Sequence, residues 1–435
     1  MKKLPAHPCI SNFLVIFLFF FSKNLAAQYV PVPAPPQAQP ILVRGATAHI
    51  GNGQVIENSL VAFEKGKFTY MGQVGSKNDF PNHLEIDATG QHLYPGFIAP
   101  NTTLGLAEID QVRATRDDAE IGELNPNIRS LIAYNTDSEV TPTVRSMGVL
   151  TAEIVPQGGR IAGTSSLVVL DAWNWEDAAY KADLAIHLNW PAISAYSWRE
   201  RRRSKNEKYD EQVREVEDFF RQAQAYFQKD HPAVSNLRFE AMNGLFSGEK
   251  RLFVHADDVQ AIQDAVLLAR EFSLTPTIVG GRDAWMIVDF LKKHQVAIIL
   301  GSTQSLPGRD DEDIDQPFKT PAMLQQAGLL WCFSHTSFWQ QRNLAFQAGQ
   351  AVSFGLAYED AVRALTSNTA RIFGIGDAVG TIETGKDATF FLCQGDVLDM
   401  RTSKLTRAFI QGRDVSLDNK QEMLYRRFQE KYKER

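Results

Sequence analysis

Residues 86–103 read Ile-Asp-Ala-Thr-Gly-Gln-His-Leu-Tyr-Pro-Gly-Phe-Ile-Ala-Pro-Asn-Thr-Thr, and the pattern of the whole chain changes within them. Before Pro95, from Ile41 to about Leu93, short β-rich runs alternate with turns, and Gly-Asn-Gly at 51–53 is typical of a hairpin. After Pro95, continuous apolar runs alternate with stretches that predict helices. The stretch therefore joins a small β domain to a larger domain of a different class.

The larger domain shows a strand–helix alternation. Strand-like apolar runs lie at 148–155, 252–255, 276–279, 296–300 and 330–333, and predicted helices lie at 258–272, 284–293 and 338–355. Continuous apolar strands between helices are typical of a parallel sheet that is covered on both faces. At this length the alternation predicts an α/β fold with a TIM-like (β/α)8 barrel over residues 95–375.

The β pattern returns after the barrel, at 380–392 and 408–415. We expect the segments 41–94 and 376–416 to pair into one small β-sandwich built from the N- and C-terminal parts of the chain, followed by a charged helix at 417–435. An insertion-like stretch at 199–228 opens with five charged residues and predicts a solvated amphipathic helix on the barrel rim, with the binding of an anionic ligand as the alternative.

The first 27 residues predict export. Lys2 and Lys3 give a positive start, Phe13–Phe21 is a short apolar core, and Ala26 and Ala27 precede the expected cleavage site, as in a secretory signal peptide. The apolar core is too short to span a bilayer, and we expect no membrane contact after cleavage. We therefore expect a periplasmic or secreted protein with an extended, proline-rich leader at 28–40.

Charge and cysteine content narrow the class of protein. Residues 1–27 carry three lysines and no acidic residue, so their removal takes the formal net charge from -6 to -9. An acidic chain of this kind is not expected to bind nucleic acid, which requires a basic face. The remaining cysteines, Cys332 and Cys393, lie in apolar runs and are expected to be buried free thiols, since there is no disulfide framework or zinc spacing.

Three separated blocks resemble the signatures of the amidohydrolase superfamily, in its imidazolonepropionase-like, metal-dependent branch. They are Ile-Asp-Ala-x-Gly leading into Pro-Gly-Phe-Ile at 86–98, the block at 358–374 with Ala-Leu-Thr-Ser-Asn-Thr-Ala, and Gly-Thr-Ile-Glu-Thr-Gly-Lys-Asp-Ala within 379–388. Their order and spacing extend the resemblance over essentially the whole mature chain. It implies hydrolysis of amide, cyclic amide or amine C–N bonds by a metal-bound water, with a carboxylate handling the proton.

The resemblance also locates the metal ligands, and most of them are replaced. Metal-dependent members have Asp-x-His-x-His directly after Pro-Gly-Phe-Ile, where this chain has Ala99, Asn101 and Thr103. No lysine is an evident modified bridging ligand. The chain is thus similar to a divergent member that lacks the His-x-His metal motif.

On the later barrel strands the resemblance retains one ligand. His255 matches the histidine of the fifth strand, Gly280 stands where the next ligand would fall, and Ser334 stands for the catalytic Asp. Zinc takes at least three protein ligands, so His255 alone cannot hold it. We therefore expect no cofactor, and a divalent metal such as zinc only if the ligands lie elsewhere.

Five residues are candidates for a site at the barrel mouth. His255, Ser334 and His335 are candidate catalytic residues, and Asn101, Thr103 and His255 are candidates for binding a substrate or ligand. His255 could instead be a structural histidine. A Ser334–His335 nucleophile pair is a hypothesis, although neighbouring residues of a strand point to opposite faces.

Two other stretches admit more than one interpretation. The acidic run 310–315 could hold a hard cation such as calcium, or be a solvated loop. The glycine-rich run 157–166 matches neither a P-loop nor a dinucleotide fingerprint and predicts a turn near the barrel mouth. Trp173, Trp175 and Trp190 could border that turn, or pack in the core or an interface.

These observations leave three hypotheses for function. The first is a hydrolase of non-peptide C–N bonds whose altered site leaves activity impaired or absent. The second is a non-catalytic relative, or pseudoenzyme, that binds a small-molecule ligand in the barrel mouth. The third is a structural partner that forms a heterodimer with an active paralogue, and a homo-oligomer is a related expectation.

Overall fold

A computed structural model describes residues 32–76, 80–197, 202–229, 234–309, 311–335 and 337–433. The predicted signal peptide at 1–27 lies outside these residues, as do the first four residues of the leader. The described residues from Pro33 onward form one compact unit.

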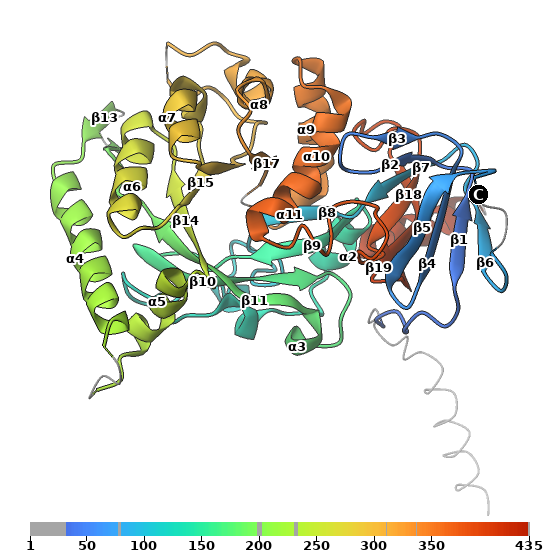
Figure 1. Cartoon of the computed structure of the whole chain (residues 1–435), viewed down its shortest axis with the longest axis horizontal. Helices are drawn as coiled ribbons and strands as arrows, with labels where there is room; N and C mark the ends of the chain where they lie inside the picture. The colour runs from blue at the N-terminus through green and yellow to red at the C-terminus, as the bar shows by residue number, and fades with distance from the viewer. Residues whose placement is uncertain are drawn as a thin grey trace, which may run out of the picture. The chain divides into compact units, whose positions relative to one another are not determined.

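An eight-stranded sheet forms the centre of this unit (Figure 1). Its strands, in spatial order, are β17 (Trp331–Phe333), β16 (Ala297–Leu300), β15 (Thr277–Gly280), β14 (Arg251–Ala256), β11 (Ala179–Asn189), β10 (Ile161–Val169), β9 (Val149–Ile154) and β8 (Phe97–Thr102). The sheet curls into a nearly closed barrel, which confirms the predicted TIM-like α/β fold.

One strand departs from the predicted parallel arrangement. β10 runs antiparallel to both β9 and β11, whereas the other neighbouring pairs are parallel. The prediction of a turn over 157–166 was wrong from Ile161 onward, because Gly158 and Gly159 alone make the turn, both at positive φ. Gly163 lies inside the strand, where a Cβ atom would meet the Ile128 carbonyl oxygen at 2.6 Å.

The two edges of the sheet, β8 and β17, do not pair with each other in the described part of the chain. Helices α10 (Tyr358–Leu365) and α11 (Ser367–Phe373) contact both edge strands and cover the gap. The sequence block at 358–374 thus forms the helical closure of the barrel.

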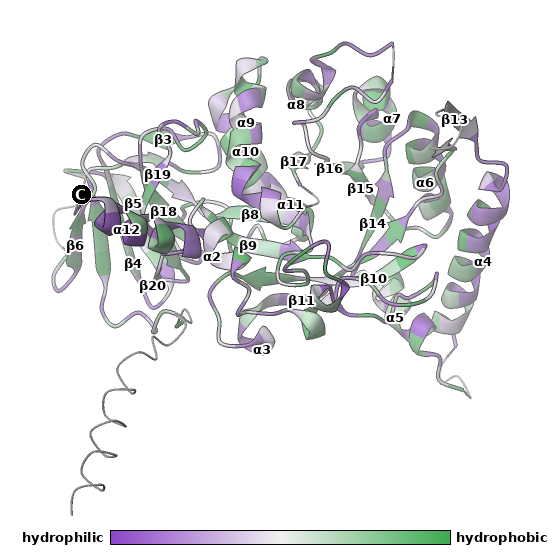
Figure 2. Cartoon of the chain, turned by 180° about the vertical axis from the view of Figure 1, so that it is seen from behind, coloured by the Kyte–Doolittle hydropathy of each residue, from purple (hydrophilic) through white to green (hydrophobic). Residues whose placement is uncertain are grey.

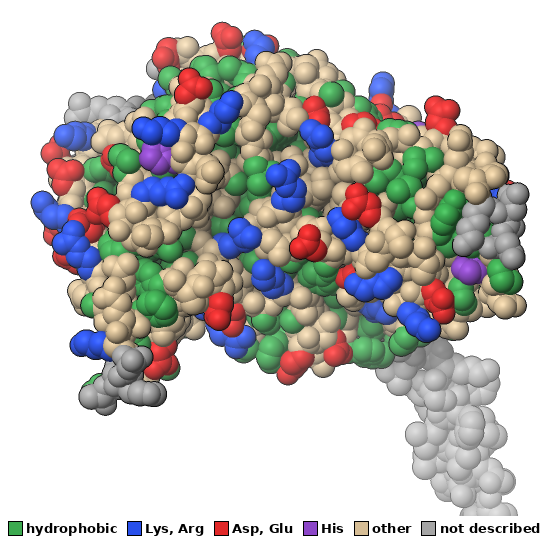
Figure 3. All heavy atoms as spheres, in the orientation of Figure 1, with side chains coloured by type: hydrophobic (Ala, Val, Ile, Leu, Met, Phe, Trp, Pro, Cys, Tyr) green, Lys and Arg blue, Asp and Glu red, His purple; other side chains and the backbone are tan. Residues whose placement is uncertain are grey.

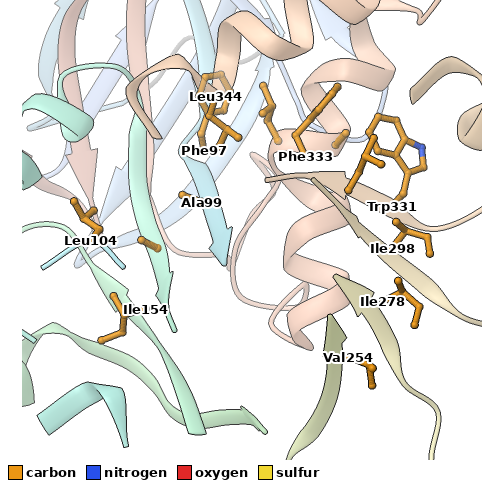
Figure 4. Packing of buried hydrophobic residues seen from close by; sticks show 14 of the residues in the cluster. Phe97, Ala99, Leu104, Ile154, Val254, Ile278, Ile298, Trp331, Phe333 and Leu344 are labelled. Atoms are coloured by element: carbon orange, nitrogen blue, oxygen red, sulfur yellow. The ribbon is translucent and has the colours of Figure 1, made fainter. Parts of the chain in front are cut away.

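The strands bury apolar side chains on both faces. Inside the barrel, Leu167, Ala185, Phe253, Val279, Ile299 and Cys332 form a cluster with Phe373 of α11. On the outer face, Val254, Ile278 and Ile298 follow one another on successive strands, as Figure 4 shows, and belong to the main core under the helices. Because side chains alternate along a strand, both sets come from the same continuous apolar runs.

The helices around the barrel follow the predicted alternation. They are α2 (Val140–Arg145), α3 (Trp175–Ala178), α4 (Tyr209–Phe227), α5 (Leu237–Ser247), α6 (Val259–Glu271), α7 (Val288–Lys293), α8 (Gln316–Gln326) and α9 (Leu344–Ser353), with 3-10 turns η1 (Arg113–Thr115), η2 (Ser130–Ala133), η3 (Ala284–Ile287) and η4 (Trp339–Asn343). The predicted helix 258–272 forms as α6. The predictions at 284–293 and 338–355 each form as a 3-10 turn followed by an α-helix.

The predicted rim insertion is more buried than expected. A short hairpin of β12 (Ser194–Ser197) and β13 (Arg202–Lys205) precedes α4, and residues 198–201 lie outside the described part of the chain. One face of α4 buries Val216, Phe219, Phe220 and Ala223 in the main core, and Figure 2 shows apolar and polar residues on different sides of this helix. α4 is therefore a packed helix of the domain with one solvated face.

Two further sheets form the β-sandwich. One has the order β5 (Lys67–Gln73), β4 (Ser59–Glu64), β1 (Ile41–Arg44), β6 (Leu84–Asp87); the other has β20 (Arg413–Val415), β19 (Lys404–Ile410), β18 (Phe390–Gln394), β7 (His92–Pro95), β2 (Thr47–His49), β3 (Val55–Ile56). β18 pairs antiparallel with β7, so the two ends of the chain share a sheet. This confirms the sandwich built from both segments.

The remaining expectations on the chain concern its end and its thiols. The predicted charged C-terminal helix forms as α12 (Lys420–Lys433) and contacts α2 (Figure 2). Cys332 and Cys393 are buried free thiols, as predicted. Among the described residues, no helix combines the length and apolarity needed to cross a bilayer.

Candidate functional site

A polar layer lies directly above the apolar interior of the barrel, at the C-terminal ends of the parallel strands. Side chains two residues apart on a strand share a face, so the residue two positions from each interior apolar residue belongs to the next layer. That layer contains Ser165 on β10, His187 on β11, His255 on β14 and Ser334 after β17, with Glu153 on β9. Apart from His255, these side chains have no exposed surface.

Glu153, His187 and His255 form a continuous hydrogen-bonded chain. The Glu153 Oε1 atom lies 3.1 Å from Nε2 of His187, and Nδ1 of His187 lies 2.9 Å from Nε2 of His255. The Ser165 hydroxyl donates to the same Glu153 oxygen at 2.8 Å. Both ring nitrogens of His187 are therefore engaged, one by a carboxylate and the other by a second imidazole.

The other carboxylate oxygen of Glu153 is bound by the backbone of Asn101. Its N–H donates to Oε2 at 3.0 Å, and Asn101 adopts a left-handed φ of 53° where the β8–β9 register is irregular. Asparagine tolerates this conformation better than most residues. The irregular end of β8 thus turns a main-chain donor towards a buried carboxylate, which needs such donors when it leaves water.

His255 is held neutral. Burial, followed by the proximity of His187, lowers its pKa from 6.5 to about 3. When a neutral His187 donates from Nε2 to Glu153, its Nδ1 accepts the N–H of His255 Nε2, and His255 is then also a neutral imidazole. Its Nδ1 atom is the part of this layer that remains available for a further hydrogen bond.

The structure does not form the hypothetical Ser334–His335 pair. The Ser334 hydroxyl donates to the Leu300 carbonyl at 2.8 Å, and His335 Nδ1 accepts the N–H of Ser337 at 3.3 Å. Burial lowers the pKa of His335. Ser334 thus links the end of β17 to β16 through a side-chain hydrogen bond. His335, the next residue, makes its own contact with Ser337.

Three further residues lie at or just after the C-terminal ends of barrel strands, namely Thr103, Gly280 and Asp257. Thr103 is buried, and its carbonyl accepts the N–H groups of Leu106 and Ala107 as the chain leaves β8. At Gly280, where the resemblance implies a metal ligand, φ is +98° and a Cβ atom would meet the Asp257 carboxylate at 2.6 Å. The Asp257 side chain lies against this glycine, and burial raises its pKa.

A zinc ion does not fit the donors of this layer. Glu153 binds three donors, His187 has no free ring nitrogen, and His255 retains only Nδ1. Three or more free ligands are needed around one point, and the described residues include no group of His, Cys, Asp or Glu that could supply them. Hydrogen bonds between side chains thus take up the groups that would otherwise bind metal.

A cavity of about 740 Å³ opens at the C-terminal end of β9, and none of the polar-layer residues lines it. Pro156, which follows β9, lines it together with Asp118, Ile128 and Ser130 of the long connection between β8 and α2. The Ser130 hydroxyl donates to the carbonyl of Ile154 at 2.8 Å, which ties this connection to the end of β9. The cavity is thus part of the end of the barrel where the site residues lie.

The acidic loop is internally paired where the structure describes it. Asp311 binds Arg309, and Asp313 and Asp315 bind Lys319. Asp310 lies outside the described residues. These contacts support the solvated-loop interpretation over a cation site.

The tryptophans named with the glycine-rich turn lie in different environments. Trp190 is buried, and its indole donates to the Tyr209 hydroxyl at 3.0 Å. Trp173 is 66% exposed, and Trp175 begins α3 and is partly buried against the core. Packing therefore accounts for Trp175 and Trp190.

Glu153 and His187 are the site residues that the sequence analysis missed. Glu153 lies in the predicted strand 148–155, to which no site residue was assigned, and β11, which carries His187, was not predicted. Each is the one ionisable residue of a buried apolar run, at 149–154 and at 184–188, and such residues are rarely fully buried without a partner. That pattern was a signal available in the sequence.

Comparisons with known proteins agree with the fold. The model of the amidohydrolase family matches residues 322–418. The solved amidohydrolase from Thermotoga maritima is 22% identical, with 86% of this chain and 99% of that chain covered and a TM-score of 0.76. A prolidase solved with N-methylphosphonate-L-proline is 16% identical (87% and 99% covered, TM-score 0.54), and molinate hydrolase is 14% identical (90% and 96%, TM-score 0.55). No curated protein matches the chain.

The matched segment 322–418 holds the last barrel strand, the helices α10 and α11 and the returning sandwich strands. These are the parts that contain two of the three blocks quoted from the sequence. The solved structures share the same barrel and sandwich over most of the chain. The chain therefore has the fold of the solved amidohydrolase from Thermotoga maritima, and its residues 322–418 match the amidohydrolase family model.

Proposed function

We propose that this protein is exported and binds a small polar ligand at the C-terminal ends of its barrel strands, and that metal-dependent hydrolysis of C–N bonds is impaired or absent in it. The observation that carries the proposal is the engagement of both His187 ring nitrogens, by Glu153 and by His255. A histidine held in this way keeps the site polar and ordered without a metal.

The ligand class follows from the groups that remain. His255 is neutral and offers one ring nitrogen, while Asn101 and Thr103 offer amide and hydroxyl groups at the end of β8. Such groups donate and accept hydrogen bonds without providing a countercharge. They suit an uncharged polar ligand such as a small linear or cyclic amide.

A panel of small linear and cyclic amides tests the proposal. We expect one or more of them to raise the melting temperature of the mature protein while remaining chemically intact, since ligand binding stabilises the folded state. The His255→Ala variant should lose that shift. The proposal fails if no amide raises the melting temperature, or if the shift is the same in the variant.

A metal-independent hydrolase is the second candidate. The Glu153–His187–His255 chain orders an imidazole by a buried carboxylate, as in sites where a base activates a nucleophile. The low pKa of His255 makes it a weak base near neutral pH, which disfavours this candidate. Release of amine in the presence of a chelator, lost in His255→Ala, would support it.

Export rests on residues 1–27, which have the order of a secretory signal peptide. We expect the mature chain to begin at Gln28. N-terminal sequencing of protein recovered outside the cytoplasm checks this, and an intact Met1 on that protein would contradict it.

A further inference from the structure

A second cavity lies at the opposite end of the barrel from the polar layer. Its volume is about 530 Å³. It is bordered by Gly328–Leu330, which precede β17, by α10 and α11, and by the turn after β2 that contains Asn52. Sandwich, barrel and closing helices thus all contribute to its wall.

Cationic side chains dominate the charged residues of this cavity. Arg363, Arg371 and Lys386 line it, against a single carboxylate from Asp377. Figure 3 shows several Lys and Arg side chains over the part of this face where Figure 1 places α11. In a chain of net charge -6 such a concentration of positive charge is a local feature.

Neighbouring acids neutralise two of the three cations only in part. Asp360 binds one terminal nitrogen of Arg363 at 2.7 Å, and Glu383 binds Lys386 at 3.0 Å. The Nε atom of Arg363 is buried and has no hydrogen-bond partner. A buried donor without a partner costs free energy, and an unseen ligand or water is the usual explanation.

Arg371 is the cation without a partner. It is exposed on α11, and within the described part of the chain its guanidinium makes no hydrogen bond or ion pair. A planar guanidinium presents paired N–H donors that match a carboxylate or a phosphate group. Arg371 therefore supplies unused donors to the cavity, and Arg363, which also lines it, adds positive charge beside them.

We propose that this cavity binds a small anion bearing a carboxylate or phosphate group, with Arg371 and Arg363 as its main ligands and Lys386 contributing charge. The site is separate from the polar layer around His255, and its occupancy does not depend on the function proposed there. Its position between sandwich and barrel would let the anion bridge the two.

Calorimetric titration of the mature protein with inorganic phosphate and, separately, with succinate tests the proposal at constant ionic strength. We expect saturable binding of at least one of them, and the one that binds identifies the preferred group. Arg371→Ala should weaken it by roughly tenfold or more, as expected for loss of a charge-assisted hydrogen bond. Arg363→Ala should weaken it similarly.

Two variants serve as controls. Arg44→Ala removes an exposed arginine that pairs with Glu85 outside this cavity, and it should leave the affinity unchanged. His255→Ala should also leave it unchanged. Absence of saturable binding to either anion, or equal affinity in the folded Arg371→Ala variant and the wild-type protein, would overturn the proposal.

Discussion

Nδ1 of His187 lies 2.9 Å from Nε2 of His255, so two imidazoles at the C-terminal ends of the barrel strands are hydrogen-bonded to each other. Glu153 holds the far nitrogen of His187, and Asn101 and Ser165 hold Glu153. Each polar group of this buried chain except His255 Nδ1 thus has a partner. A network satisfied in this way is rigid, and removal of one member leaves the others without partners in a medium of low polarity.

Replacement of Glu153 should therefore destabilise the fold. Glu153→Ala leaves His187, Ser165 and the Asn101 N–H without their acceptor, and we expect a loss of about 3 kcal/mol in the free energy of unfolding. Urea unfolding at neutral pH measures it. Glu85→Ala, which removes an exposed carboxylate paired with Arg44, should change the same quantity by less than about 1 kcal/mol. Equal effects of the two changes would contradict the network.

Stability should fall on acidification because of His255. Its pKa in the folded protein is about 3, below the ordinary 6.5, owing to burial and then to His187. The unfolded chain binds this proton as the pH falls through 6.5 and the folded chain does not until about 3. The contribution of His255 to the free energy of unfolding is therefore complete above pH 6.5 and is lost progressively below it. The loss between pH 7 and 5 is at most about 2 kcal/mol.

The non-titrating variant His255→Asn isolates this contribution from those of the other histidines. The free energy of unfolding at pH 7 and at pH 5 is measured for both proteins. The wild-type protein should lose more stability than the variant over this interval. The same loss in both proteins would show that His255 titrates normally in the folded state.

Ser334 should be structural rather than nucleophilic. Its hydroxyl donates to the Leu300 carbonyl, so Ser334→Ala should cost about 1 kcal/mol of stability. The melting shift caused by an amide ligand should be retained, as should any release of amine. Loss of such turnover in a folded Ser334→Ala protein would restore the nucleophile hypothesis.

The antiparallel strand β10 depends on Gly163. A Cβ at this position would meet the Ile128 carbonyl oxygen at 2.6 Å, and φ is +146°. Gly163→Ala should reduce the free energy of unfolding by about 2–3 kcal/mol, through backbone strain and overpacking. Gly90, at φ +76° with no atom within 4 Å of a Cβ, is the matched control. Gly90→Ala should reduce the free energy of unfolding only by the backbone strain of a positive φ, about 1 kcal/mol.

The barrel and sandwich were predictable because their strands are continuous apolar runs and the change of pattern at Pro95 separates them. β11 escaped prediction because Lys181 and Asp183 interrupt its apolar run. Asp183 donates its N–H to Ser166 and its carboxylate binds Arg129, and such long-range partners are invisible in a local pattern.

The residues of the candidate site were predictable only at positions that the resemblance to the amidohydrolase superfamily marks as metal ligands. Asn101 and His255 were found as replaced and retained ligands of a known motif. The partners that define their role, Glu153 and His187, come from strands that meet only in the folded barrel. Which polar residues satisfy one another is a property of the three-dimensional pairing of strands, and spacing along the sequence does not contain it.

Metal content tests the central claim most directly. The mature protein is purified without a chelator and without a metal-affinity tag, and its zinc, iron and manganese are measured by elemental analysis. We predict metal far below one equivalent, because side-chain atoms of Glu153, His187 and His255 that could bind a metal are hydrogen-bonded to one another. Near-stoichiometric metal would contradict this, and would mean that the hydrogen-bonded chain opens to form a metal centre.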